Sequence, residues 1–185
     1  DPVGGIRIAA RGGNRVEGCF ISTDPTGMLA RGNFLEGISI GSSNNVIGGS
    51  TVTAQRNLIT ENTTGINITG ALAAGNLVIG NYVGSLSGSD VAANTNGIVV
   101  NGGAHANTIG GSAAGRGNLI SGNIATGLLI DGAGANGNLV QGNKIGTDAA
   151  GASALPNGQD GVSVSVGSSN VIGGSGPGEG NVISG

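Results

Sequence analysis

A short motif recurs six times along the chain: a glycine, an apolar residue, any residue and a second apolar residue. Its copies follow one another at a nearly regular interval and begin at Gly5, Gly37, Gly65, Gly97, Gly127 and Gly161. Apolar residues at every second position are typical of a half-buried β-strand. The motif therefore predicts one short strand in each of six units.

Asparagine forms a second series, whose spacing is almost constant. Each member precedes an apolar pair or near-pair, and the members are Asn14, Asn45, Asn76, Asn107, Asn138 and Asn170. The two series interleave, so one structural unit contains about 31 residues. Because side-chain amides at one corner of stacked units can hydrogen-bond to one another, this column predicts a structural asparagine ladder.

Two further strand-like pieces complete each unit. The second piece follows the ladder asparagine and carries Val16, Ile47, Val78, Ile109, Val140 and Ile172. The third piece carries Ile21, Ile59, Val83, Ile120, Ile145 and Ile183. β-Branched residues are typical of strands, and the glycines and asparagines between the pieces are typical of turns.

The long loop changes its place from one unit to the next. The first, third and fifth units join pieces two and three tightly and continue into a long loop after piece three. The second, fourth and sixth units place the loop between pieces two and three. The complete repeat is therefore a pair of units, about 62 residues long.

Three short strands in every unit, stacked at a constant period, indicate an all-β parallel β-helix. One unit cannot bury its apolar face alone, whereas stacked units share a continuous core. We expect a single solenoid domain over residues 1–185, with about six coils and a length of roughly 29 Å. The repeats begin and stop so close to both ends that we interpret the chain as a segment of a longer array.

Composition and charge exclude several other classes of protein. The 185 residues include 41 glycines and 4 prolines, without a Gly-X-Y period, which opposes a helix bundle and excludes collagen. The net charge of −3 contains no large block of one sign, so we expect no nucleic-acid partner. No apolar run approaches the ~18 residues that span a bilayer, so we expect no membrane span, and we expect no signal peptide within this segment.

Three phrases carry a resemblance to a known family: GNLISGN at 117–123, GNKIGTD at 142–148 and NVIGG at 170–174. They resemble the right-handed parallel β-helix repeats of the pectin-lyase-like superfamily, above all the repeat arrays of bacterial secreted and surface proteins. This resemblance covers nearly the whole chain and implies a right-handed, single-stranded coil. It implies no single activity, because members include enzymes that cleave or epimerise acidic polysaccharides, phage tailspikes, adhesins and passive stalks.

The ionisable residues offer little catalytic chemistry. Asp24 and Asp148 hold equivalent positions four coils apart, or roughly 19 Å, which is too far for a carboxylate pair. Asp148 and Asp160 belong to one loop and could meet, but turn formation is the simpler role. His105 is the only histidine and is expected in a solvated turn. Cys19 is the only cysteine and is expected to replace a ladder asparagine, because it aligns with Asn81 and Asn143.

One column is a candidate for contact with a glycan. Phe20 and Tyr82 share a position in the third piece two coils apart, and Lys144 follows two coils further on. An aromatic ring can stack on a sugar, so this column is the face that we nominate as a binding groove. The alternative is packing of the same side chains under a loop.

Two further features concern contacts at the surface. An apolar stripe follows the ladder asparagines and points outward if strand alternation holds there: Arg15, Val46, Leu77, Thr108, Leu139 and Val171. A loop covers this stripe, or it serves lateral association. Four arginines lie in the first coil, where they solvate an end or contact an acidic polymer: Arg7, Arg11, Arg15 and Arg31.

The sequence favours a structural or interaction repeat module, a stalk or adhesin-like part of a secreted or cell-surface bacterial protein. We expect no catalysis by this segment, no catalytic residue, no metal and no cofactor. The alternatives are a polysaccharide lyase or epimerase domain and a noncatalytic glycan-binding surface. Expected partners are a polysaccharide, or further copies that associate through the coil ends or the apolar stripe.

Overall fold

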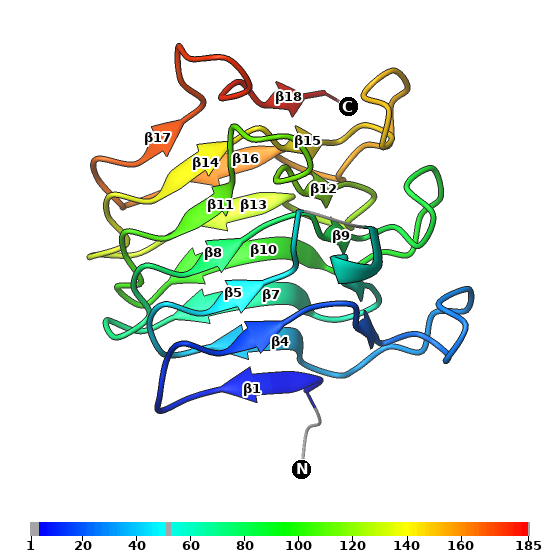
Figure 1. The fold of residues 1–185 in the computed structure, drawn as a ribbon, viewed down its shortest axis with the longest axis horizontal. Coiled ribbons are helices and arrows are strands. Elements are labelled where there is room, and N and C mark those ends of the chain that lie inside the picture. The colour runs from blue at the N-terminus through cyan, green and yellow to red at the C-terminus, as the bar shows by residue number, and fades with distance from the viewer. Residues whose placement is uncertain (1–3, 51–52, 185) are drawn as a thin grey trace.

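The chain winds through three parallel sheets, and each pass adds one strand to every sheet (Figure 1). A computed structural model describes residues 4–50 and 53–184. Each sheet contains six strands, so the chain completes about 5 turns of ~31 residues between its first and last strands. The expected all-β parallel solenoid is therefore confirmed.

The three sheets repeat in the same order in every coil. The first sheet contains β1 (Ile6–Ile8), β4 (Glu36–Ile40), β7 (Thr64–Thr69), β10 (Asn96–Asn101), β13 (Leu128–Ile130) and β16 (Val162–Val164). The second contains β2 (Arg15–Val16), β5 (Val46–Ile47), β8 (Leu77–Val78), β11 (Thr108–Gly110), β14 (Leu139–Gln141) and β17 (Val171–Ile172). The third contains β3 (Phe20–Ile21), β6 (Leu58–Ile59), β9 (Tyr82–Val83), β12 (Leu119–Ile120), β15 (Lys144–Ile145) and β18 (Val182–Ile183). We number the coils one to six by these strands.

Loops alternate between two places, as the sequence predicts. In coils one, three and five, the loop follows the third-sheet strand, and these three loops protrude from one side of the solenoid (Figure 1). In coils two, four and six, the loop joins the second sheet to the third, and the first of these loops contains the 3-10 helix η1 (Thr53–Gln55). We call them odd-coil loops and even-coil loops.

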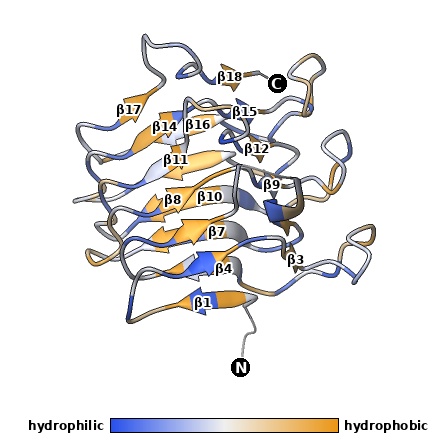
Figure 2. Cartoon of the chain, viewed as in Figure 1, coloured by the Kyte–Doolittle hydropathy of each residue, from blue (hydrophilic) through white to orange (hydrophobic). Residues whose placement is uncertain are grey.

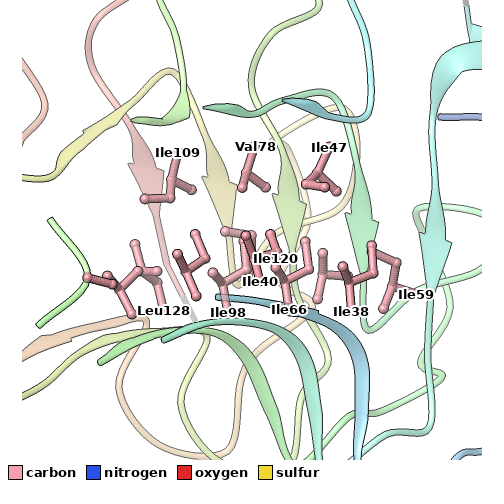
Figure 3. Close-up of a cluster of buried hydrophobic side chains, with 14 of the residues drawn as sticks. Ile38, Ile40, Ile47, Ile59, Ile66, Val78, Ile98, Ile109, Ile120 and Leu128 are labelled. Carbon is pink, nitrogen blue, oxygen red and sulfur yellow. The ribbon is translucent and has the colours of Figure 1, made fainter. Parts of the chain in front are cut away.

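The core is a stack of β-branched and leucine side chains that point inward from all three sheets. Most of the strands are coloured as hydrophobic in Figure 2. Their inward-facing apolar side chains gather inside the solenoid (Figure 3). Equivalent residues lie in register on neighbouring coils, as for Ile38, Ile66, Ile98 and Leu128 of the first sheet. All four are fully buried. Stacking thus gives every inner coil the apolar contacts that it cannot make alone.

The recurring glycine of the sequence motif is explained by a close approach inside each coil. A Cβ atom added at any of its six copies would lie between 2.6 and 3.1 Å from a core side chain of the third sheet. At Gly65, for example, it would lie 2.6 Å from Cγ1 of Val83 and 2.7 Å from the carbonyl oxygen of Gly97. Only glycine lets the first and third sheets meet at this corner without a shift of the backbone.

The predicted asparagine ladder is present along its whole length. In each rung, the backbone N–H and the Nδ2 amide of one asparagine donate to Oδ1 of the asparagine in the next coil, at 2.8–3.1 Å. The ladder starts at the exposed Asn14, passes through Asn45, Asn76, Asn107 and Asn138, which are buried, and ends at Asn170. It satisfies polar groups at the corner that leads into the second sheet.

Two more ladders occupy the other two corners, and the sequence predicts only Asn81 and Asn143 of their members. The second ladder leads into the third sheet, with side-chain bonds of 2.8–3.0 Å between Asn57, Asn81, Asn118, Asn143 and Asn181. The third leads back to the first sheet, with bonds of 2.9–3.1 Å between Asn33, Asn62, Asn94, Asn123 and Asn157. Each of the three corners is therefore held by its own column of amides.

A left-handed residue precedes every asparagine of the first ladder. Its φ lies between 53° and 79° in the six coils, at Gly13, Asn44, Gly75, Ala106, Gly137 and Ser169. Glycine and asparagine adopt this conformation readily, whereas a Cβ-bearing alanine is strained by about 1–2 kcal/mol. Ala106, with φ of 53°, is therefore the residue with the poorest match to its corner.

Replacement of Ala106 by glycine is expected to stabilise the protein by about 0.5 kcal/mol, since the strain relieved exceeds the extra entropy of the unfolded chain. The measurement is the free energy of unfolding from urea denaturation. The matched control is Ala114→Gly, at an exposed loop position whose φ is not positive, where about 0.5 kcal/mol should be lost. Equal effects at the two positions would contradict the strained corner.

Candidate functional site

The column that the sequence nominates for glycan contact lies on the outer face of the third sheet. Cα partners run from Phe20 to Leu58, Tyr82, Leu119 and Lys144, so the nominated residues occupy alternate coils of one column. Their inward neighbours in the same strands belong to the core. The column therefore has the predicted register, and its contact with a glycan stays a prediction.

The odd-coil loops fold back onto these same side chains. A Cβ atom added at Gly27 would lie 3.2 Å from the Phe20 ring, and one added at Gly88 would lie 2.9 Å from the Tyr82 ring. Gly151 approaches Lys144 in the same way, and the Lys144 ammonium donates a hydrogen bond to the carbonyl oxygen of Ala149. For Tyr82 and Lys144, these contacts support the alternative interpretation, in which the column packs under loops, whereas Phe20 keeps 50% of its surface exposed.

Tyr82 is covered from an even-coil loop as well. The guanidinium carbon of Arg56 lies 3.7 Å from the centroid of the Tyr82 ring, which is a cation–π arrangement. Nothing in the spacing of the repeats connects Arg56 with Tyr82. The stacked guanidinium occupies the ring face that a sugar would need.

A surface depression of about 240 Å³ lies beside this stack. Its lining includes the side chains of Arg56, Tyr82, Leu119 and Lys144, together with glycine backbone from the adjoining loops and turns. Basic and aromatic groups from coils two, three and five thus face one hollow. The depression is the candidate site of this protein.

An aspartate organises each of the three odd-coil loops. Asp24 accepts hydrogen bonds from the backbone N–H groups of Met28 and Leu29, at 3.0 Å each. Asp148 accepts from the N–H of Ala152 at 2.8 Å. In coil three, the same task falls to Asp90, at the far end of the loop, which accepts from Leu86 and Ser87 at 3.0 and 2.9 Å. Turn formation is therefore the observed role of Asp24 and Asp148.

These hydrogen bonds lower the pKa of the loop aspartates. The hydroxyl of Thr26 and then the N–H of Leu29 lower the pKa of Asp24 below its usual 3.8. The N–H groups of Ala152 and Ser153 lower the pKa of Asp148. At Asp90, burial acts in the opposite direction, but donors from Ser87 and Ser85 outweigh it, and the pKa is lowered there too.

We expect the odd-coil loops to loosen in acid before the core does. Because the folded pKa lies below the unfolded one, each carboxylate stabilises its loop above about pH 4, and this stabilisation is lost as the pH falls through the folded pKa. The measurement is an NMR titration of the Asp148 carboxyl carbon, compared with a peptide of residues 146–155. The protein should titrate at the lower pH; equal midpoints would contradict the role of the loop hydrogen bonds.

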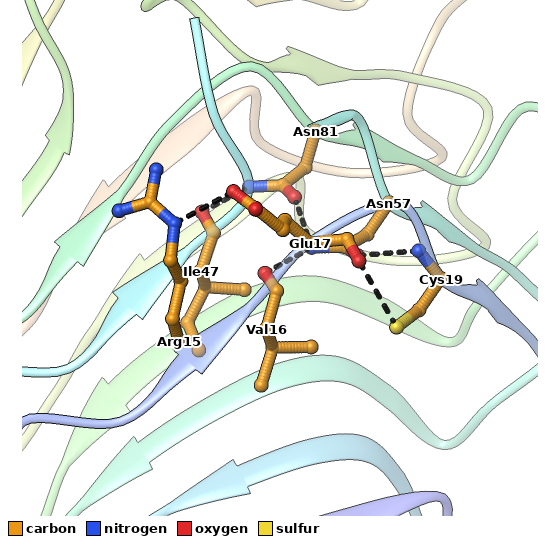
Figure 4. A network of polar contacts seen from close by, with 7 residues as sticks. All are labelled: Arg15, Val16, Glu17, Cys19, Ile47, Asn57 and Asn81. Carbon is orange, nitrogen blue, oxygen red and sulfur yellow. Dashed lines mark hydrogen bonds and ion pairs between the residues drawn. The ribbon is translucent and has the colours of Figure 1, made fainter. Parts of the chain in front are cut away.

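Cys19 occupies the first position of the second ladder, as the sequence predicts (Figure 4). Its backbone N–H donates to Oδ1 of Asn57 at 2.9 Å, and its thiol contacts the carbonyl oxygen of Glu17 at 3.4 Å. The neighbouring Arg15 is paired with Glu17 at 2.6 Å. His105 is exposed in its turn, with Nδ1 3.1 Å from the carbonyl oxygen of Gly103.

The residues of the apolar stripe point outward, as expected if inward and outward residues alternate along the strands of the second sheet. Its members pair in register along the second sheet, and the residue after each of them points into the solenoid. Val46, Leu77, Thr108 and Leu139 are half-buried, whereas Arg15 and Val171 are exposed.

Within residues 4–50 and 53–184, no group of three or more His, Cys, Asp or Glu side chains is placed to hold a metal ion. The same residues include no helix with the length and hydrophobicity that a membrane crossing requires.

Comparison with protein-family models, curated proteins and solved structures returned no match to this sequence. The functional interpretation therefore rests on the structure itself: the register of the strands, the three asparagine ladders and the depression beside Tyr82.

Proposed function

We propose that this chain is a structural or interaction module, a stalk or adhesin-like repeat of a secreted or cell-surface bacterial protein, without catalysis of its own. The observation that supports this proposal is the continuity of the three ladders. They run through coils of both loop types without interruption, at side-chain distances of 2.8–3.1 Å. A rod in which each coil supports the next suits a role as a spacer that presents loops at fixed intervals.

The proposal includes association with further solenoid surfaces. Val164, Ile172 and Ile183 of coil six occupy core positions, yet 43%, 39% and 47% of their surfaces are exposed. A neighbouring coil would cover these side chains and pair the strands of coil six. The apolar stripe is the second surface that we propose for association. Light scattering that found a monomer at every concentration would contradict association of the 185-residue chain.

The test of the functional proposal is incubation with pectate, alginate and related polymers, with and without calcium. Cleavage is followed by absorbance of unsaturated ends and by reducing-end assay, and epimerisation, which breaks no bond of the polymer chain, by the uronate composition from ¹H NMR. Binding is followed by co-sedimentation with the insoluble polymers. We expect no turnover, and binding without turnover would fit an adhesin-like module. Turnover that tracks with the purified chain would overturn the proposal in favour of a lyase or epimerase domain.

A further inference from the structure

Two of the few basic residues of an acidic chain meet at one depression. The protein has 7 lysines and arginines and a net charge of −3. Four of the arginines belong to coil one, and the remaining basic residues are Arg56, Arg116 and Lys144. Arg56 and Lys144 both line the depression of about 240 Å³ beside Tyr82. Positive charge is therefore focused at this place.

Within residues 4–50 and 53–184, neither cation has a carboxylate partner. Throughout the described part of the chain, the one ion pair joins Arg15 to Glu17. No acidic residue lines the depression, and Nε of Arg56 is buried without a hydrogen-bond partner among the described residues. Arg56 is half-buried, so its guanidinium is partly withdrawn from water without a counter-charge, and an anion in the depression would supply that charge.

Arg56 is also held in place for such a partner. Its guanidinium stacks on Tyr82 at 3.7 Å, and the Tyr82 ring is supported from the loop that contains Gly88. Stacking engages the face of the guanidinium and leaves its edge, which carries the N–H groups, for hydrogen bonds. An arginine with a fixed plane loses little entropy when it binds an oxyanion through two parallel N–H bonds.

We propose that this depression binds an oxyanion, the carboxylate, sulfate or phosphate group of a small solute. Arg56 provides the hydrogen-bonding edge, and Lys144 adds a second positive charge from coil five. Carboxylate, sulfate and phosphate groups would all accept hydrogen bonds from Arg56 in this way, and titration with each anion distinguishes them. The inference does not depend on the proposed structural function, since the site lies in the middle coils and is separate from the coil ends and the apolar stripe.

The test is a series of ¹H–¹⁵N NMR titrations with sodium sulfate, sodium phosphate and sodium acetate, with sodium chloride used to keep the ionic strength constant. We expect saturable shifts of the amides of Gly117 and Gly142 with a dissociation constant in the millimolar range. Arg56→Gln should weaken binding by at least about tenfold, because two charge-assisted hydrogen bonds are replaced by at most one neutral one. The same spectra show whether each variant is folded.

The matched control is Arg116→Gln. Arg116 holds the equivalent position in the next even-coil loop, but its side chain does not line the depression. This variant should bind within about twofold of the parent, a difference below about 0.5 kcal/mol. Lys144→Gln provides a second variant if Arg56→Gln does not fold. Shifts that do not saturate with any of the three anions, or equal losses in Arg56→Gln and Arg116→Gln, would overturn the proposal.

Discussion

Gly65→Ala should destabilise the protein by about 3 kcal/mol, the upper range for overpacking of a closed core. The added methyl group would lie 2.6 Å from Val83 and 2.7 Å from the carbonyl oxygen of Gly97. Neither the backbone of Gly97 nor the β-branched side chain of Val83 can move away unless its strand moves. Relief of the clash would therefore displace the neighbouring coils. The measurement is the shift of the urea midpoint at unchanged slope.

Gly180→Ala is the matched control for this substitution. A Cβ atom at Gly180 would meet nothing within 4 Å, and its φ is not in the left-handed region. The control should change the free energy of unfolding by less than about 0.5 kcal/mol. A loss below about 1 kcal/mol in Gly65→Ala would show that the corner between the first and third sheets is looser than the structure has it.

Asn107→Leu should destabilise the protein by about 4 kcal/mol, although leucine matches asparagine closely in length. Oδ1 of Asn107 accepts from the backbone N–H and Nδ2 of Asn76 at 2.9 and 2.8 Å, and its own Nδ2 donates to Ala73 at 3.0 Å. The substitution leaves the backbone N–H and the Nδ2 amide of Asn76 buried without an acceptor, and each unsatisfied donor costs about 1–3 kcal/mol. The carbonyl oxygen of Ala73 keeps the hydrogen bond that it accepts from the N–H of His105 at 3.2 Å. The free energy of unfolding is again the measurement.

Asn14→Leu provides the control within the same ladder. Asn14 is exposed at the first rung, so water replaces the bonds that its side chain loses. We expect a loss below about 1 kcal/mol. Similar losses at Asn14 and Asn107 would mean that the amides act through packing alone and that burial of the hydrogen bonds is unimportant.

The sequence predicts the regular part of this molecule. The six copies of the glycine motif and the six evenly spaced asparagines assign each strand to its sheet and each coil to its neighbours. These two patterns predict the fold correctly because no long loop is inserted between the first-sheet strand and the first-ladder asparagine of a coil. The position of Cys19 at the start of the second ladder follows from the same alignment.

The other two ladders are hidden by the alternating loops. In the second ladder, from Asn57 to Asn181, the sequence separation between bonded members alternates between short and long, at 24, 37, 25 and 38. A short separation and the long separation next to it add up to the length of one coil pair. The asparagines of this ladder therefore recur regularly every two coils, although their spacing from one coil to the next is irregular. A search at the period of the coil pair would have found this column.

The stack of Arg56 on Tyr82 could not be predicted from spacing. It joins an even-coil loop to a strand of the next coil, and the path of that loop is set by local turns that leave no periodic trace. The role of Asp90 was missed for a related reason. The loop of coil three places its aspartate at the opposite end from Asp24 and Asp148, so alignment by position pairs those residues with Leu86.

The central claim is that equivalent residues of successive repeats lie on adjoining coils, and the side-chain amides of the first ladder report on it directly. A ¹⁵N-edited NOESY spectrum should show cross-peaks between the Nδ2 protons of Asn76 and Asn107, and between those of Asn107 and Asn138. These protons should also exchange slowly with solvent, because the three residues are buried. Absence of both cross-peaks in assigned spectra, or a cross-peak from Asn76 to Asn138 in their place, would contradict the stacking order.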